Sequence, residues 1–160
     1  MTQAPGAPII APAPIPANDD VQARLTSYKP PDNWKPDPNA SSIVAAAFEA
    51  TNTDGAAKIT ATMLLSSGGG TLANINRWRD QLGLPPVGSL EMQPITDLGH
   101  GNLIVDLVSA DNTRRMMSSI IASKDQTWFF KMTGPPKALE AERAAYEKLV
   151  RSVGLGEPTP

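Results

Sequence analysis

The chain has 160 residues with 14 basic and 16 acidic side chains, so its formal net charge is −2. A nucleic-acid-binding protein usually carries a basic excess or stripe, because its affinity comes largely from neutralising phosphates. The longest basic cluster here is only Arg77-Trp78-Arg79, which argues against that class of partner. With no cysteine and one histidine, the composition excludes disulfides, Cys-based zinc sites and His-rich metal sites. We expect neither a metal nor a cofactor.

The N-terminal quarter of the chain differs in composition from the rest, since nine of the 16 prolines fall within residues 1–40. Residues 1–17 repeat Ala and Pro, which favours extended polyproline II. We therefore predict a flexible proline-rich tail over residues 1–27, with a short helix near residues 19–27. A single α+β domain is predicted over residues 28–154 and a disordered C-terminus over residues 155–160. A domain of this size buries roughly two-thirds of its unfolded surface, which is enough to fold alone.

The start of the chain bears on the compartment. Residues 1–5 (MTQAP) lack the basic and apolar regions of a secretory signal, and no stretch approaches about 18 apolar residues. One interpretation is a cytosolic protein; the other is that an export signal was removed and Met1 added. The second is favoured because such a Pro/Ala spacer commonly separates a membrane anchor from a folded domain. We expect a bacterial periplasmic or outer-surface protein, anchored through a removed N-terminal signal or lipid.

The first elements of the domain follow a proline-rich loop over residues 28–38. Four prolines there forbid a helix or a central strand, and we expect Trp34 to pack against the domain. Residues 42–50 form a strand candidate, and residues 58–65 (KITATMLL) alternate as a half-buried strand does. The Asp-Gly pair between them predicts a hairpin turn over residues 51–55.

The next segment predicts an amphipathic helix over residues 71–82, because apolar residues recur there at three- and four-residue spacing. Residues 92–98 contain a proline, which predicts an edge strand. Two further strands, 116–123 and 127–132, follow the one at 103–109, and their short apolar sequences predict central strands covered on both faces. A final helix runs from about residue 136 to Val153. This order predicts an α+β fold, an antiparallel β-sheet flanked by helices.

Residues 69–86 (GGTLANINRWRDQLGLPP) resemble a motif of uncharacterised bacterial exported proteins, many of them lipoproteins. Residues 127–135 (TWFFKMTGP) and the Pro31-x-x-Trp34 pattern fit the same group, so the resemblance covers roughly residues 28–153. One departure is Asp80, where a small residue is common. That family is in turn similar in fold to the PsbP photosystem subunit and the Ran-binding Mog protein. The resemblance implies an α/β/α sandwich and, by analogy, a binding or assembly role.

The polar face of the predicted helix is the first candidate site. Asparagine is a poor mid-helix residue, so two of them beside two arginines and a tryptophan indicate specific hydrogen bonds. One interpretation is a surface that binds a protein partner or an anion. The other is that Asn74 and Asn76 tie the helix to neighbouring loops while an arginine pairs with a carboxylate. The candidate binding residues are Asn74, Arg77, Trp78, Arg79 and Gln81.

Other candidates have a structural interpretation that we prefer. The glycine-rich segment 66–70 before the helix could offer N–H groups to an anion, but it lacks a phosphate-loop lysine. We expect a flexible loop with Thr71 capping the helix. His100 lies in a glycine turn, and no sequence pattern pairs it with a serine nucleophile. Asp106 is interpreted as a solvent-facing strand residue. Three glutamates of the last helix are interpreted as its solvated face: Glu140, Glu142 and Glu147.

The sequence therefore predicts no catalytic residues and no enzyme. We expect a non-catalytic cell-envelope protein that acts through protein–protein contacts with a partner that the sequence does not identify. The alternative is a periplasmic small-molecule or lipid-binding carrier, which requires an apolar cavity between sheet and helix. Nucleic acid is not expected as a partner, and a membrane is expected only through an N-terminal anchor outside this chain.

Overall fold

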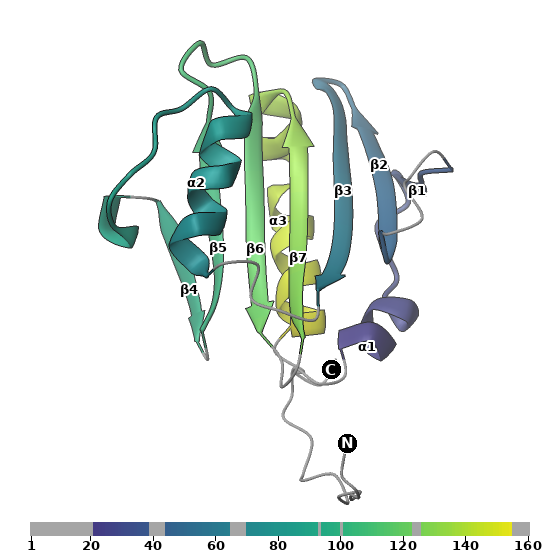
Figure 1. Ribbon diagram of the computed structural model, residues 1–160. Coiled ribbons are helices and arrows are strands. Elements are labelled where there is room, and N and C mark those ends of the chain that lie inside the picture. The colour runs from purple at the N-terminus through teal and green to yellow at the C-terminus, as the bar shows by residue number, and fades with distance from the viewer. Residues whose placement is uncertain are drawn as a thin grey trace, which may run out of the picture.

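The computed structural model describes residues 21–38, 44–64, 70–92, 94–99, 101–122 and 126–154. Within these residues the chain forms one seven-stranded sheet with helices on both faces (Figure 1). The strands are β1 (Trp34–Pro36), β2 (Ala46–Asn52), β3 (Gly55–Leu64), β4 (Ile95–Gly99), β5 (Asn102–Val108), β6 (Arg115–Ala122) and β7 (Thr127–Gly134). The helices are α1 (Val21–Ser27), α2 (Thr71–Gln81) and α3 (Pro136–Gly154), with a short 3₁₀ turn at Leu90–Met92. The predicted α+β fold class is confirmed.

The sheet order is β1-β2-β3-β7-β6-β5-β4, and every neighbouring pair is antiparallel. The predicted hairpin is confirmed, because Asn52 pairs with Gly55 across a two-residue turn. Gly55 has φ of 132°, a conformation that side chains other than glycine rarely adopt. The proline-containing segment forms β4 at one edge of the sheet, as its proline predicted.

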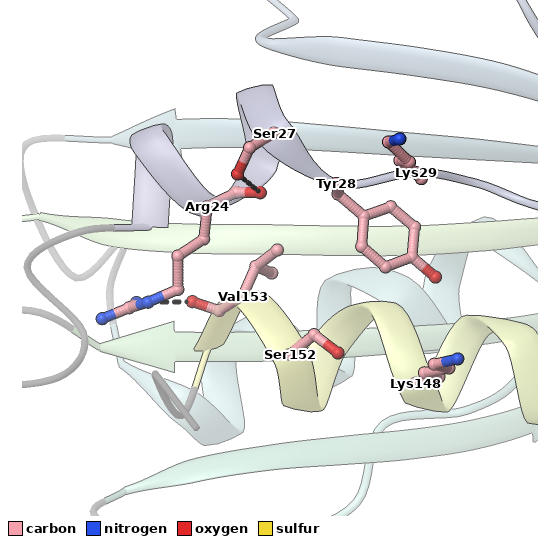
Figure 2. A pocket seen from close by; sticks show the side chains of 7 residues that line it. All are labelled: Arg24, Ser27, Tyr28, Lys29, Lys148, Ser152 and Val153. Atoms are coloured by element: carbon pink, nitrogen blue, oxygen red, sulfur yellow. Dashed lines mark hydrogen bonds between the residues drawn. The ribbon is translucent and has the colours of Figure 1, made fainter. Parts of the chain in front are cut away.

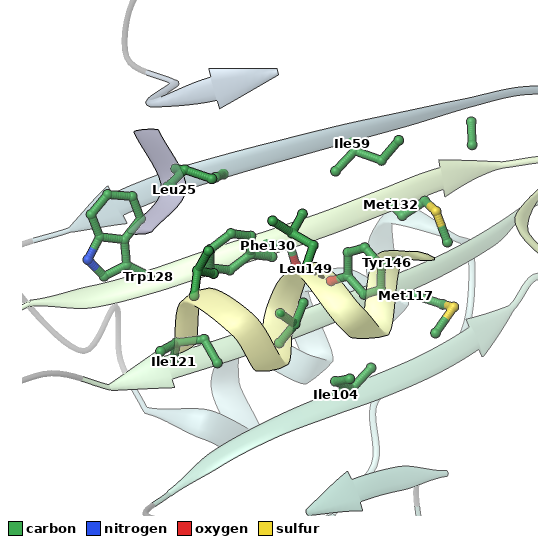
Figure 3. Close-up of a cluster of buried hydrophobic side chains, with 14 of the residues drawn as sticks. Leu25, Ile59, Ile104, Met117, Ile121, Trp128, Phe130, Met132, Tyr146 and Leu149 are labelled. Atoms are coloured by element: carbon green, nitrogen blue, oxygen red, sulfur yellow. Dashed lines mark hydrogen bonds between the residues drawn. The ribbon is translucent and has the colours of Figure 1, made fainter. Parts of the chain in front are cut away.

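Helix α3 packs on one face of the sheet and closes the larger core. Trp128 and Phe130 of β7 point toward the helix, where Tyr146 and Leu149 meet them, and each of the four is almost fully buried (Figure 3). The Tyr146 hydroxyl lies 2.9 Å from the Phe130 carbonyl, to which it donates, and 2.7 Å from the Ser119 hydroxyl. The space between sheet and α3 is therefore filled by side chains.

Helix α2 lies on the opposite face, over β4 to β6 (Figure 1). Its predicted apolar stripe is confirmed, since Ile75, Trp78 and Leu82 are buried against β5 and β6. Trp78 also meets Phe129 of β7 edge-on, with ring centroids 6.3 Å apart. As a result β6 is covered on both faces, as predicted. The same prediction for β7 is wrong, because alternate residues of β7 remain only half-buried on the α2 side.

The folded unit begins earlier than residue 28. Val21 and Leu25 of α1 are buried in the α3-side core, so helix α1 belongs to the domain although the sequence placed it in the tail. Trp34 is buried, as expected. Its segment forms the edge strand β1, whereas the prolines had led us to predict a loop there. The tail before Val21 and the C-terminus 155–160, both predicted to be disordered, lie outside the described residues.

Candidate functional site

The five binding residues predicted on helix α2 do not share one surface. Trp78 is buried in the core under the helix, and Asn74 is buried with its amide donating to the Gly70 carbonyl at 2.8 Å. The Arg77 guanidinium is exposed and donates to the Asn74 side-chain oxygen. Asn74 and Trp78 therefore hold the helix in place, and of the five residues Arg77 and Gln81 are the exposed ones.

The side of α2 that faces β4 is occupied by the loop that follows the helix. Asn76 donates to the Val87 carbonyl at 3.0 Å and accepts from the Val87 N–H at 2.8 Å. Arg79 donates from Nε to the Pro85 carbonyl at 2.6 Å. The interpretation of Asn76 as a tie between the helix and a loop is thus confirmed, and Arg79 donates to the same loop.

The opposite side of α2 meets a lysine that the sequence analysis missed. Lys131 of β7 is half-buried and donates from Nζ to Gln81 Oε1 at 3.1 Å. Burial lowers the pKa of Lys131, and the nearby charge of Arg77 lowers it further. Two predicted residues, Arg77 and Gln81, therefore meet Lys131 in a basic corner between helix and sheet. Lys131 is the only charged residue in the strand sequence TWFFKM, and this was the signal from which the sequence analysis could have singled it out.

Beside this corner, β3, β2 and β1 lie beyond α2, and no helix in the described part of the chain covers them on this side of the sheet (Figure 1). Phe129 touches α2, so Lys131 and Thr133, which alternate with it, point to the same side. The strand register extends this surface across β3 and β2. We call it the open face, and within the described residues the register places on it Ala47, Glu49, Thr51, Ala56, Lys58, Thr60, Thr62, Leu64, Thr127, Phe129, Lys131 and Thr133.

The alanine and threonine side chains of the open face are short, whereas Glu49, Lys58 and Lys131 are longer and charged. Its cations Lys58 and Lys131, with Arg77 on the helix wall and Lys35 on β1, outnumber the single carboxylate of Glu49. The whole chain has the opposite balance, with more acidic than basic residues. The local balance of charge on this side is therefore positive, although that of the whole chain is negative.

The carboxylate of Glu142 is a structural group and not part of a solvated face, so that prediction was wrong. It is buried and accepts hydrogen bonds from Trp34 Nε1 at 2.8 Å, Asn52 Nδ2 at 2.8 Å and Asn33 Nδ2 at 2.9 Å. Burial raises the pKa of Glu142, but the bonds from Asn52, Trp34 and Asn33 outweigh it and hold the pKa below the ordinary 4.5. This carboxylate ties β1 and the hairpin turn to α3.

Asp106 is likewise paired, which corrects its interpretation as a solvent-facing residue. Its two oxygens accept from Nε and Nη2 of Arg115 at 2.9 and 2.6 Å, a bidentate contact. Arg115 also reaches Glu140 at 2.9 Å, and Glu147 pairs with Arg143 at 3.1 Å. Asp106 and Glu140 thus join strands to α3 through Arg115. Glu147 pairs within α3, and no two of these carboxylates form a pair poised for acid–base chemistry.

The remaining candidates give little for a catalytic site. His100 and residues 66–69 of the glycine-rich loop lie outside the described residues. Gly70 precedes α2 as its cap residue with no side-chain capping bond, so Thr71 is the first helical residue and does not cap the helix. In the described part of the chain, no cluster of three metal-ligating side chains occurs. No helix there is both long and apolar enough to span a membrane.

No protein-family model matches this sequence, and a search of curated proteins gives no significant match. The resemblance of residues 69–86 to an exported-protein family therefore stays a prediction. Among solved structures, the chain is similar to the protein of unknown function PA94 from Pseudomonas aeruginosa, at 14% identity and a TM-score of 0.44. That alignment covers 78% of this chain and 88% of that one.

Two further solved structures are similar to this chain. Cyanobacterial PsbP (CyanoP) from Synechocystis sp. PCC 6803 has 13% identity and a TM-score of 0.47, with 76% of this chain and 81% of that chain covered. LpqN of Mycobacterium tuberculosis, involved in cell envelope biogenesis, has 15% identity and a TM-score of 0.37, with 79% and 78% covered. Similarity at this level does not extend to function.

Proposed function

We propose that this protein is a non-catalytic component of the bacterial cell envelope that binds a protein partner through the open face. The observation that carries the proposal is the asymmetry of the sheet. One side is covered by α3 and α1, whereas α2 covers only the β4–β6 half of the other side. A sheet surface that no described helix covers offers area for a protein contact.

The charges of this surface indicate the chemistry of the partner. Arg77 and Lys131 lie close enough for each charge to affect the other, and within the described residues no carboxylate forms an ion pair with Lys131. An acidic side chain presented by the partner would relieve this repulsion and receive charge-assisted hydrogen bonds. We therefore infer a partner with an acidic contact segment.

The envelope location rests on the composition of the N-terminal segment. The Ala-Pro pattern of residues 1–17 is typical of an extended spacer, and such a spacer holds a domain away from an anchor. Fractionation of cells that express the native gene tests the location. Recovery of the protein in the envelope or periplasmic fraction is expected, and recovery in the cytosol alone would refute this part of the proposal.

The alternative of an apolar carrier has less support in the structure. Its cargo pocket was expected between sheet and helix, and on the α3 side Trp128, Phe130 and Tyr146 fill that space. On the α2 side a cavity of about 600 Å³ lies beside β4, but the carboxylates of Glu91 and Asp97 are in its lining, which suits an apolar cargo poorly.

An enzyme has less support still, since the carboxylates of Asp106, Glu140 and Glu142 are engaged in holding strands to α3. Contact with a protein is the function that makes use of the open face and its positive charge.

Site-specific photo-crosslinking in living cells tests the contact surface. A photoreactive residue replaces Thr62 on the open face, and a second strain carries it at Ala144, an exposed position on α3. We expect a discrete adduct of defined mass from position 62 and none from position 144. Equal labelling from both positions would show that the open face is not the contact surface.

A pair of charge substitutions separates specific docking from chance proximity. Arg77→Ala with Lys131→Ala should lower the yield of the position-62 adduct by roughly tenfold or more, because two charge-assisted contacts are lost. The matched control, Lys137→Ala with Arg151→Ala, removes the same charge from exposed positions of α3 and should leave the yield unchanged. An adduct insensitive to the first pair in folded protein would refute the acidic partner.

A further inference from the structure

A second feature of the molecule lies away from the open face, where helix α1 crosses the last turns of α3. A groove of about 390 Å³ opens there, within the size range of small-molecule sites (Figure 2). It is formed by the end of α1, the residues that follow α1, and the C-terminal turns of α3. Its lining residues are Arg24, Ser27, Tyr28, Lys29, Lys148, Ser152 and Val153.

The lining of the groove is basic and rich in hydroxyl groups. Three of its seven side chains are cations, three carry a hydroxyl, and none is a carboxylate. One cation is already committed, since Arg24 donates from Nη1 to the Val153 carbonyl at 2.8 Å. This bond offsets the partial negative charge that the C-terminus of α3 would otherwise direct toward a bound anion.

The other two cations are available to a ligand. Neither Lys29 nor Lys148 forms an ion pair with any described residue, and both are exposed at the rim of the groove. Figure 2 shows the hydroxyl of Tyr28 on the same side of the groove as the two ammonium groups. Burial raises the pKa of Tyr28, so this hydroxyl stays protonated and can donate a hydrogen bond.

From this geometry we propose that the groove binds a small phosphate monoester. A dianionic phosphate matches the two lysines in charge, and its oxygens accept from ammonium groups and from the Tyr28 and Ser152 hydroxyls. The volume of the groove leaves room for the alcohol portion of the ester against the Tyr28 ring and Val153. The phosphate could belong to a soluble ester or to a lipid headgroup, and the same contacts serve both.

Titration with glycerol 3-phosphate, followed by amide chemical shifts of the labelled full chain, tests this site. We expect saturable binding with a dissociation constant on the order of 0.1–1 mM at low salt, weakening as salt screens the exposed lysines. Shift changes should centre on residues 27–29 and 148–153, and glycerol should cause none. Absence of saturable binding up to about 10 mM, or shift changes spread over the whole molecule, would overturn the proposal.

Two double variants make the test specific. Lys29→Ala with Lys148→Ala should weaken binding at least tenfold, since both charge-assisted contacts are removed. Arg114→Ala with Lys137→Ala removes the same charge from exposed positions before β6 and in the first turn of α3, and this variant should bind as the wild type does. Equal loss in both variants would indicate only a general charge effect and would refute the site.

Vesicles distinguish the two sources of phosphate. Sedimentation with phosphatidylcholine vesicles that contain phosphatidic acid should retain the protein if the phosphate is a lipid headgroup, with loss of binding in the groove variant. Glycerol 3-phosphate binding without retention on vesicles assigns a soluble ester. The open face contributes no residue to either measurement, so the groove and the proposed protein contact succeed or fail separately.

Discussion

The carboxylate of Glu142 offers the sharpest test of the structure, through substitution by glutamine. The glutamate presents two oxygens to three N–H donors, from Asn33, Trp34 and Asn52. A glutamine has one oxygen, so its amide N–H₂ must face at least one of these donors. Asn52 cannot simply turn over to accept, because its amide also donates to the Ala138 carbonyl and its oxygen accepts from the Asp54 N–H.

The expected loss follows from these contacts. Leaving one buried donor unsatisfied costs about 1–3 kcal/mol, and the neutral acceptor weakens the bonds that remain. We expect Glu142→Gln to lower the free energy of unfolding by about 2–3 kcal/mol at pH 7, measured by urea denaturation. The control is Glu147→Gln, which breaks only a surface pair within α3 and should change stability by less than about 0.5 kcal/mol.

The pH dependence gives the same prediction a second, independent readout. The pKa of Glu142 is lower in the folded protein than its ordinary 4.5, so ionisation stabilises the fold above pH 4.5. That stabilisation is lost as the pH falls through the lower, folded-state value. The gap between wild type and Glu142→Gln should therefore be full at pH 7 and shrink on acidification below pH 4.5. A variant as stable as the wild type at pH 7, or a gap independent of pH, would refute the reasoning.

Two further substitutions test the packing of the α3 side. Tyr146→Phe leaves the buried Phe130 carbonyl without its hydroxyl donor, and we expect a loss of about 1–2 kcal/mol in urea denaturation; Tyr28→Phe, at a half-buried site, should cost less. Gly134→Ala places a Cβ 2.6 Å from the Ala56 carbonyl oxygen, so the turn must move, and we expect a loss of at least about 2 kcal/mol in thermal unfolding. Wild-type stability in either variant would contradict the described contacts.

Local patterns were enough to place most of the sheet and two helices. The alternation in β3, the apolar spacing of α2 and the Asp-Gly turn are set by neighbours in sequence, and all three appear where expected. The segment at β1 was missed because a three-residue strand leaves no periodic signal, and prolines are tolerated at a sheet edge. Its pairing with β2 decides its conformation, and no local pattern encodes that pairing.

Polar residues were the least predictable, because their partners lie far away in sequence. Glu142 sits three residues after Leu139 and four before Tyr146, a spacing that places it within the buried stripe of α3. That signal was available, but the three donors that make burial tolerable come from residues about 90 to 110 positions earlier. Lys131 shows the same limit, since its bond to Gln81 spans 50 residues.

The order of the strands has a consequence for how the chain acquires its structure during synthesis. Strands β2 and β3 form a local hairpin, but the next neighbour of β3 is β7, and their closest pair, Leu64 and Thr127, lies 63 positions apart. Closing so long a loop is slow, and until β7 emerges the inner edge of β3 presents unpaired N–H and C=O groups. A nascent chain that stops before Thr127 would hold two separate half-sheets, each with an exposed edge able to pair with another chain. The last strand and helix thus complete the fold and also remove its main aggregation risk.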